Sequence, residues 1–257
     1  MIEFNEGTQL ACILRSVVRD SINGHKKMAL MFSGGLDSAV LAIIARKSCD
    51  IRLYTIGMDG SHDLEWASQC AALLDLPYSE IIVEEGQVAS SIERVVSVHG
   101  MRNPSWMSTF VSFDMLLAEI HEEAVMCGQG ADELFGGYRK YLESADARKI
   151  MADDARELIH NEWPSYLEMA KNHGKLLMAP YLDRRVVEFA GKIPISLKIS
   201  ESENKLVLRA AADYLGVPGM MAYKKKKAMQ YGSGISKAIK QCLKDQGKGL
   251  GELMDTY

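Results

Sequence analysis

The stretch MALMFSGGLDS, residues 28–38, places two glycines, an aspartate and two serines directly after a short apolar run. An apolar run of this length next to Ser and Gly is typical of a buried strand that ends in a tight turn. The overlapping stretch DSAVLAIIARK, residues 37–47, reads as a helix. Together they predict a strand, a glycine-rich loop and a helix, the arrangement in which backbone N–H groups and the helix dipole receive a phosphate.

The same alternation continues along the first half of the chain. Short apolar runs predict strands, and helical periodicity predicts the segments between them. Strands separated by helices of 10–15 residues indicate βαβ units, whose parallel sheet is covered on both faces. The expected fold class is therefore α/β with a doubly wound parallel sheet. Further strands are expected at 51–56, 78–83 and 124–127, and helices at 8–22, 64–74, 88–98 and around 108–121.

The second half of the chain has a different pattern. After about residue 138 the strand signal disappears, and helical segments interrupted by prolines follow. We expect a single domain over residues 1–257, in which an α/β nucleotide-binding core (1–140) is joined by a mainly helical part (141–257) that completes the site. A separate small domain over 141–257 is the alternative that the sequence leaves open.

Composition excludes several classes of protein. The chain has 257 residues, of which 47% are apolar, and a net charge of −4, which gives no electrostatic reason to bind nucleic acid. No apolar run approaches the roughly 20 residues needed to cross a membrane, and the acidic, polar N-terminus is not a secretory signal. The five cysteines are odd in number and contain no C-x-x-C, so neither a disulfide framework nor a zinc ribbon is indicated. We expect a cytoplasmic protein.

The first glycine-rich loop, Ser33 to Ser38 (hereafter the first loop), carries the strongest local signal. It lacks the lysine of the G-x-x-x-x-G-K-[ST] pattern, so it is not a Walker A loop. Asp37 would repel a phosphate unless a cation lies between them, and we therefore interpret it as a Mg²⁺ ligand. A glycine-rich turn capped by serine and aspartate is the alternative for this loop taken alone.

A second glycine-rich stretch, GQGADELFGGY at residues 128–138 (hereafter the second loop), also follows a short apolar run. In an open parallel sheet both loops would leave the carboxyl ends of strands, where ligands collect. Asp132 would then complete a two-carboxylate cation site with Asp37. Two aspartate-bearing loops at strand ends are much less readily explained as simple turns.

A basic run forms the third signal. Residues 223–227 read YKKKK, and residues 230–234 read QYGSG. Four consecutive lysines usually form a solvated face. The Gly-Ser-Gly that follows favours a loop folded onto a ligand, and a lysine there would stabilise the charge of a departing pyrophosphate.

Five motifs, in the expected order over roughly residues 28–240, resemble the synthetase domain of asparagine synthetases. They are SGGLDS (33–38), YTIGMDGSHDL (54–64), GADELFGGY (130–138), APYLD (179–183) and NKLVLR (204–209). β-Lactam synthetases are relatives on the same scaffold. The wider group, the N-type (PP-loop) ATP pyrophosphatases, shares only the SGGxDS loop and includes GMP synthetase and tRNA thiolases.

The resemblance implies an ATP-dependent ligase of amino-acid biosynthesis. ATP would be cleaved to AMP and pyrophosphate, a carboxylate would be adenylated, and ammonia or another amine would attack it to give an amide. The implied cofactors are ATP and Mg²⁺. The resemblance assigns the binding of pyrophosphate to the first loop, that is to Ser33, Gly34, Gly35, Leu36, Asp37 and Ser38, and the binding of Mg²⁺ to Asp37 and Asp132. It assigns the binding of adenosine to Met31, Ile56, Cys127 and Gly128. It gives catalytic roles to Lys226 and Gln129, and to Lys205 as a second phosphate contact.

Three departures from the family's pattern limit what the resemblance implies. The first predicted helix begins close to residue 1, which leaves no room for a glutaminase domain before it. Glutamine-derived ammonia would therefore come from a separate subunit, or free ammonia or another amine would be used. Gln129 stands where the family has an acid. Either the acid's role as a proton acceptor is missing here, or this side chain only contacts the substrate, for which an amide suffices. Leu176 and Met178 replace an acid and an arginine, which favours a less polar substrate.

The expected partners are therefore small carboxylate and amine substrates, with neither nucleic acid nor a membrane, and a homodimer is one assembly left open. Two other functions compete with the ligase. A tRNA-modifying ATPase of the wider group is disfavoured by the lack of paired cysteines and of a basic surface. A nucleotide-binding regulator without catalysis would fit the changes at Gln129 and Leu176, but Asp37, Asp132 and Lys226 are retained.

Overall fold

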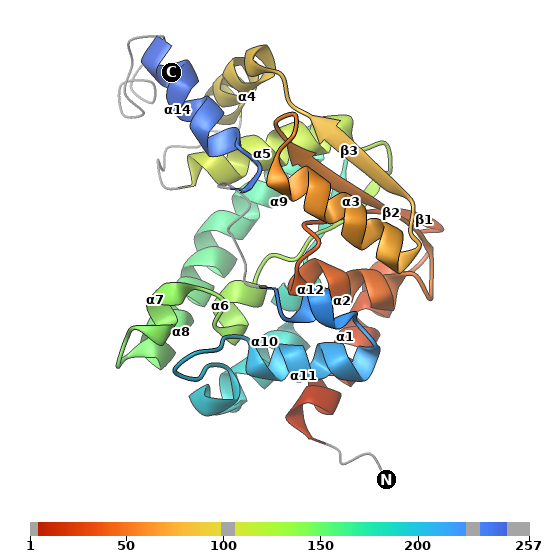
Figure 1. The fold of residues 1–257 in the computed structure, drawn as a ribbon, viewed down its shortest axis with the longest axis vertical. Coiled ribbons are helices and arrows are strands. Elements are labelled where there is room, and N and C mark those ends of the chain that lie inside the picture. The colour runs from red at the N-terminus through yellow and green to blue at the C-terminus, as the bar shows by residue number, and fades with distance from the viewer. Residues whose placement is uncertain (1–4, 99–105, 225–231, 246–257) are drawn as a thin grey trace.

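The computed structural model describes residues 5–98, 106–224 and 232–245. Its centre is a sheet of five parallel strands in the order β3-β2-β1-β4-β5, with helices on both faces (Figure 1). The predicted α/β class with a doubly wound parallel sheet is confirmed. The strands are β1 (Lys27–Met31), β2 (Asp50–Gly57), β3 (Tyr78–Ile82), β4 (Ala124–Met126) and β5 (Leu176–Met178).

Helices make up most of the rest of the described chain. None of these helices has the length and apolar character needed to span a membrane. The α-helices are α1 (Glu6–Ile22), α2 (Leu36–Ala45), α3 (His62–Leu74), α4 (Glu85–Ser97), α5 (Met107–Glu119), α6 (Ala131–Phe135), α7 (Arg139–Leu142), α8 (Ala147–Glu157), α9 (Trp163–Asn172), α10 (Arg184–Lys192), α11 (Leu206–Leu215), α12 (Gly219–Ala222) and α14 (Ile235–Asp245). A π-helical turn, η1 (Leu158–Glu162), joins α8 to α9, and η2 (Pro180–Leu182) and η3 (Ile195–Leu197) are 3₁₀ turns.

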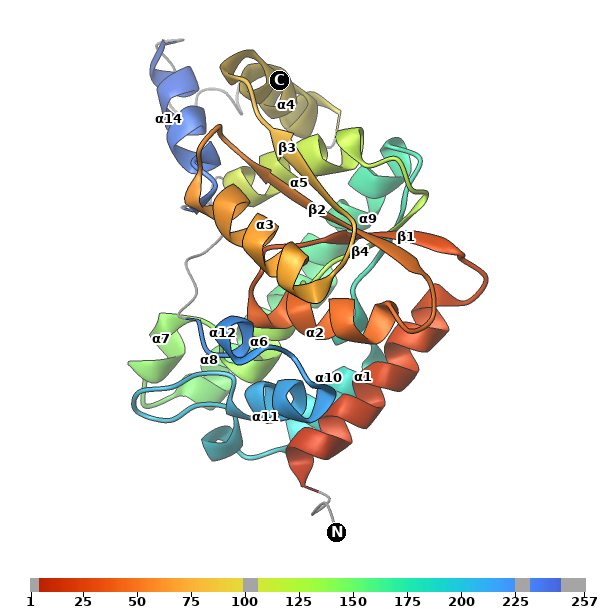
Figure 2. The ribbon, with the colours of Figure 1, turned by 45° about the vertical axis from the view of Figure 1, so that its right-hand side comes forward.

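The two faces of the sheet are covered by two separate hydrophobic layers. Successive side chains of a strand point to opposite faces, so Met28 and Leu30 pack into the layer of α1, α2 and α11, whereas Ala29 and Met31 pack into the layer of α5 and α9. Figure 2 shows the helices on either side of the strands. Burial of both faces explains why the strands appear in the sequence as continuous apolar runs rather than as alternating patterns.

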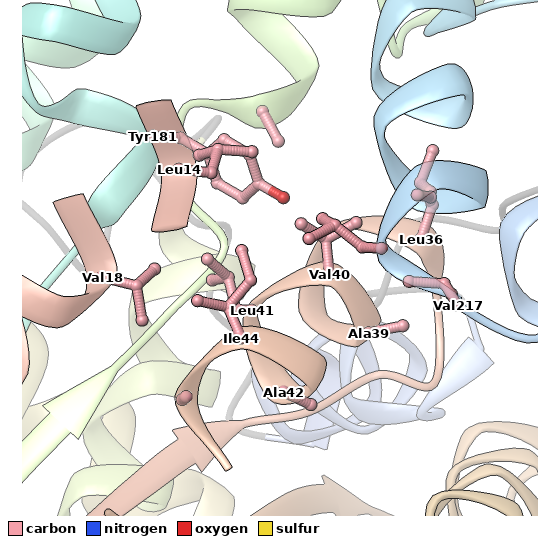
Figure 3. Close-up of a cluster of buried hydrophobic side chains, with 14 of the residues drawn as sticks. Leu14, Val18, Leu36, Ala39, Val40, Leu41, Ala42, Ile44, Tyr181 and Val217 are labelled. Atoms are coloured by element: carbon pink, nitrogen blue, oxygen red, sulfur yellow. The ribbon is translucent and has the colours of Figure 1, made fainter. Parts of the chain in front are cut away.

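The N-terminal helix joins the two halves of the chain. It packs along α11 and also contacts α2 and α10. At Gly7 an added Cβ would lie 2.6 Å from the Cβ of Ala210, so the backbones of α1 and α11 approach closely. Figure 3 shows the layer beneath, where side chains of α2 gather with Leu14 and Val18 of α1 and with Tyr181 of the second half.

One expectation about secondary structure is wrong. The sequence predicts no strand beyond residue 138, but Leu176–Met178 forms β5 and pairs in parallel with β4. A three-residue strand is shorter than the window in which alternation can be recognised. β5 forms because the edge of β4 is available for pairing. This availability depends on the tertiary structure and is not encoded in the local sequence.

The strand order creates the crevice in which the site lies. β1 pairs with β2 on one side and with β4 on the other, so the chain leaves β1 toward β2 and β3 and later returns to the opposite side. Loops that follow two such neighbouring strands diverge, and ligands of open α/β sheets bind in the gap outside their carboxyl ends. The first loop follows β1 and the second loop follows β4, as predicted.

Candidate active site

The first loop is folded tightly by its own serines. The Ser38 hydroxyl donates to the Gly35 carbonyl (3.2 Å) and accepts from the Ser33 N–H (3.3 Å), and the Ser33 hydroxyl accepts from the Gly35 N–H (3.3 Å). Gly35 is the N-cap residue of α2. The loop therefore lies around the N-terminus of α2, where helix N–H groups and the dipole favour an anion.

A tryptophan of α3 braces this loop from outside. Gly34 has a φ of +66°, and its carbonyl accepts hydrogen bonds from Trp66 Nε1 (3.0 Å) and from the Cys70 thiol (3.5 Å). The Lys224 ammonium lies 3.2 Å from the centroid of the Trp66 ring, which adds a cation–π contact. Burial raises the pKa of the Cys70 thiol to about 11. Sequence reasoning missed Trp66, because a tryptophan within a helix indicates core packing and nothing more.

The contact between Trp66 and the first loop leads to a prediction for Gly34→Ala. A Cβ at this position would lie 2.8 Å from Trp66 Cδ1 and Nε1, and a positive φ disfavours any L side chain. We expect a loss of about 2–4 kcal/mol in the free energy of unfolding from strain and overpacking together, measured by urea denaturation. Gly24→Ala is the matched control, because Gly24 has a φ of +86° but an added Cβ there would have no atom within 4 Å. Equal losses in the two variants would contradict a specific role of Trp66.

The second loop lies directly against the first. A Cβ added at Gly128 would lie 3.4 Å from the Cβ of Asp37. Gly130 has a φ of +93° and precedes α6, and a Cβ there would lie 2.3 Å from Leu182 Cδ2. Gly130 is therefore required by its left-handed backbone and by close approach, and Asp132 lies in the first turn of α6, beside the first loop.

A buried lysine links the two predicted metal-binding aspartates. Lys205 Nζ lies 2.6 Å and 2.7 Å from the two carboxylate oxygens of Asp37 and 2.6 Å from Asp132 Oδ1. The Lys205 side chain is 4% exposed, and those of Asp37 and Asp132 are 13% and 14% exposed. The structure thus brings together three residues that the sequence analysis named from separate motifs. Two carboxylates around one cation is the charge arrangement that a divalent metal would also satisfy.

Lys205 has an unusual backbone conformation, and its side chain is closely packed against neighbouring residues. Its φ of +55° is left-handed, which is uncommon for a residue other than glycine and typical of functional sites. A Cβ added at Gly137 would lie 1.7 Å from Asp132 Oδ1 and 2.5 Å from Lys205 Cε, so only glycine fits there. Asn204 Nδ2 donates to the Gly137 carbonyl at 3.0 Å.

The remaining motifs support the same cluster. The Tyr181 hydroxyl donates to the Asp37 carbonyl oxygen at 3.0 Å, and Arg209 Nη2 donates to Asn204 Oδ1 at 2.7 Å. Burial, and then the charges of Asp37 and Asp132, raise the pKa of Tyr181 well above its ordinary value, so its hydroxyl stays a neutral donor. The APYLD and NKLVLR motifs therefore meet at the cluster although they lie far from the first loop in sequence.

The residues that the resemblance assigned to adenosine are buried near the ends of β1, β2 and β4. Met31 is 8% exposed, and Ile56 and Cys127 are each 1% exposed, all within the layer of α5 and α9. Burial raises the pKa of the Cys127 thiol to about 12, which keeps it neutral. Leu36 instead packs into the opposite layer, so only its backbone faces the first loop. The adenosine role stays a prediction.

Gln129 belongs to a group of side chains that sequence reasoning did not assemble. Its side chain lies beside the hydroxyl of Tyr166, a fully buried residue of α9, and acts to lower the pKa of that hydroxyl. Glu162, four residues earlier in the π-helical turn, acts on the same hydroxyl through its charge. Burial, followed by the charges of Glu133, Glu157 and Asp154, raises the pKa of Glu162 to about 7. A carboxyl group that titrates near neutrality therefore lies close to the position where the family's acid is missing.

No local signal in the sequence could have singled out Glu162. In LIHNEW it resembles an exposed residue of an amphipathic helix. Only the π-helical turn, which is frequent at functional sites, and the neighbouring acids distinguish it.

Two other predicted site residues have different outcomes. Lys226 lies outside the described residues, although Lys224 on one flank stacks on Trp66 and the Ser233 carbonyl on the other accepts a hydrogen bond from the Met58 N–H at 2.8 Å. Leu176 is 48% exposed and pairs with Ala124 at the amino end of β4, whereas the site is at the carboxyl end. The structure therefore gives no support to Leu176 as a wall of the substrate pocket.

Comparison with known proteins agrees with these motifs. The model of the asparagine synthase family matches residues 9–178 and 167–252. The protein named putative asparagine synthetase 1 (glutamine-hydrolysing) of Methanocaldococcus jannaschii is 31% identical, over 94% of this chain and 53% of its own length. Carboxyethyl-arginine β-lactam synthase of Streptomyces clavuligerus is 24% identical, over 94% and 48%. The chain spans about half the length of the curated relatives it matches.

A structural comparison finds NMN synthetase of Francisella tularensis, with a TM-score of 0.48, 14% sequence identity, and coverage of 96% of this chain and 88% of that one. The family assignment rests instead on the match of the family model to most of the chain, and four of the five motifs meet at the Asp37–Lys205–Asp132 cluster. The chain belongs to the asparagine synthase family.

Proposed function

We propose that this chain is the synthetase part of an ATP-dependent carbon–nitrogen ligase, which adenylates a small carboxylate and transfers it to ammonia or an amine. The observation that carries the proposal is the Asp37–Lys205–Asp132 cluster between two loops at the carboxyl edge of the sheet. The first loop would receive the phosphates that become pyrophosphate, and the buried ends of β1, β2 and β4 would contact adenosine.

The residues present fit a magnesium ion. Mg²⁺ is usually held by one or two carboxylates together with substrate phosphates, not by a cage of protein groups. Asp37 and Asp132 supply two carboxylates around a common point, and the described residues contain no cluster of three or more ligating side chains. Asp37 and Asp132 would hold the ion, which when bound offsets the charge of the phosphates. Lys205 supplies a positive charge to the same two carboxylates from within the chain.

The proton released as the amide forms needs an acceptor. Gln129 cannot take it, because an amide does not ionise at neutral pH. We assign this role to Glu162, whose pKa of about 7 suits a group that accepts a proton at physiological pH. Tyr166, which lies beside Gln129 and is influenced by the charge of Glu162, would position the two side chains relative to each other.

The nitrogen donor proposed for this chain is ammonia. The relatives named glutamine-hydrolysing are about twice the length that this chain matches. The purified chain should therefore use ammonium and leave glutamine unconsumed. Consumption of glutamine by the chain alone would contradict this part of the proposal.

The function is tested by identifying the products of ATP cleavage. The purified chain is incubated with ATP, Mg²⁺, ammonium and a panel of amino-acid carboxylates, and nucleotides are separated by chromatography. We expect AMP and pyrophosphate, lost in Asp132→Asn and kept in the control Asp153→Asn, which changes an exposed aspartate of α8. Formation of ADP and orthophosphate would overturn the proposal.

Lys226 is predicted to act on the developing charge of pyrophosphate. Lys226→Ala should lower kcat roughly 10²–10³-fold, about 3–4 kcal/mol, with a smaller effect on ATP affinity, because the contact strengthens in the transition state. Steady-state kinetics and ATP titration separate the two effects. Lys240→Ala, an exposed lysine of α14, is the control. Equal effects of the two variants would show that the lysine run is only a basic surface.

A further inference from the structure

A cavity lies beside α6, and Glu133 and Leu134 of that helix line it. It has a volume of about 330 Å³ and is bounded by α6, α8, η1, α10 and the η3 turn. This size is at the lower end of the range of small-molecule sites. Most of its lining is apolar, including Leu134, Met151, Ile159, Val187, Ile193 and Ile195.

The polar groups that face this cavity are mainly cationic. The cations Arg148, Arg156 and Lys198 line it, together with the imidazole of His160 and a single carboxylate, that of Glu133. The Arg156 guanidinium already pairs with Asp153 at 2.9 Å, and Glu133 Oε1 accepts a hydrogen bond from the Tyr138 hydroxyl at 2.6 Å. Arg156 and Glu133 therefore have partners within the chain.

Arg148 and Lys198 are different. Within the described ranges, 5–98, 106–224 and 232–245, neither side chain forms an ion pair with a carboxylate. Burial, and then the charge of Arg148, lower the pKa of Lys198 to about 8. Two neighbouring cations without a counter-charge, one of them half-buried, are electrostatically unfavourable. An anion placed between them would offset both the burial of the Lys198 charge and its repulsion by Arg148. The apolar lining favours an anion that also carries a hydrocarbon chain.

We propose that this cavity binds a small aliphatic carboxylate, with its head group between Arg148 and Lys198 and its hydrocarbon chain on the apolar lining. The site is separate from the Asp37–Lys205–Asp132 cluster, and the inference does not depend on the proposed function. Inorganic anions lack the apolar part that the lining would bury, and neutral amides lack the charge that the two cations require.

The test uses hexanoate as the probe, titrated into the whole chain by isothermal calorimetry at pH 7. Hexanamide, which has the same chain without the charge, and inorganic phosphate, which has charge without the chain, are the comparison ligands. We expect hexanoate to bind more tightly than either. Equal affinity for hexanoate and hexanamide, tighter binding of phosphate, or no hexanoate binding would each overturn the proposal.

Variants locate the site. Lys198→Gln and Arg148→Gln should each weaken hexanoate binding about 10-fold, the loss of one charge-assisted hydrogen bond. Lys149→Gln, which changes the exposed neighbour of Arg148 on α8, should leave the affinity unchanged. A circular dichroism melt of each variant reports whether it is folded. Unchanged affinity in folded Lys198→Gln and Arg148→Gln would place hexanoate elsewhere and refute the site.

The pH dependence supplies an independent readout. Lys198 faces Arg148, Arg156, His160 and Glu133 across the cavity. With its pKa at about 8, the lysine is protonated below that pH and loses its charge as the pH rises through it. Hexanoate affinity should fall about 10-fold between pH 7 and pH 9, and the fall should be absent in Lys198→Gln. The same fall in that variant would contradict a head-group contact with Lys198.

Discussion

Replacement of Lys205 by methionine is expected to lower the free energy of unfolding by about 3–5 kcal/mol, the effect of leaving buried charges without their partner. Methionine keeps the length and apolar stem of lysine but removes the ammonium that lies 2.6 Å from oxygens of both Asp37 and Asp132. The two carboxylates, which are mostly buried, would then repel each other. Urea denaturation at pH 7 measures the loss.

Two further measurements show that the loss comes from these charges. Asp132→Asn combined with Lys205→Met should restore part of the stability, because only one charge is then unpaired. Millimolar Mg²⁺ should stabilise Lys205→Met more than the unchanged protein, because an ion that binds the folded state shifts the equilibrium toward it. Lys192→Met, at an exposed lysine of α10, is the control. A loss below about 1 kcal/mol, the typical value of a surface pair, would refute a central role for Lys205.

Glu162→Gln is expected to reduce amide formation by roughly 10²–10⁴-fold, the usual contribution of a general base. ATP–pyrophosphate exchange, which reports adenylation alone, should be nearly unchanged. The side chain accepts protons only when ionised, and burial with neighbouring acids raises its pKa to about 7. At a constant concentration of unprotonated ammonia, the rate of amide formation should therefore rise with pH through about 7, and this rise should disappear in the variant.

The chain offers both a control and a rescue for this experiment. Glu168→Gln changes an exposed acid of α9 and should have little effect on the rate. Gln129→Glu, introduced into Glu162→Gln, should recover part of the lost amide formation, because an acid then stands again beside Tyr166. If Glu162→Gln impaired exchange and amide formation equally, the residue would position the nucleotide and not accept the proton.

The alternation of strands and helices was predictable because it depends on local properties. Both faces of the sheet are buried, so the strands are apolar runs, and Gly and Ser mark the point where β1 ends. The positions of Asp37 and Asp132 followed from a geometric rule, that ligands of open parallel sheets collect at the loops after the carboxyl ends of neighbouring strands. These parts of the fold and the site required no knowledge of distant contacts.

Other parts of the site depend on contacts between segments far apart in the chain. Lys205 is 168 residues from Asp37, and its left-handed backbone does not follow from any preference of lysine. The sequence analysis named Lys205 by resemblance but could not show that it links both aspartates.

By itself, therefore, the sequence determined the class of fold, the order of its elements and the two loops that carry aspartates, because these follow from local periodicity and from turn residues. Only the tertiary structure decided that Lys205 joins those aspartates, that Trp66 braces the first loop, that Leu176 forms part of an edge strand, and that Glu162 has a pKa near 7. Each of these depends on contacts, burial or charges brought together by folding, and none of these is encoded in the identity of a residue or of its neighbours in the chain.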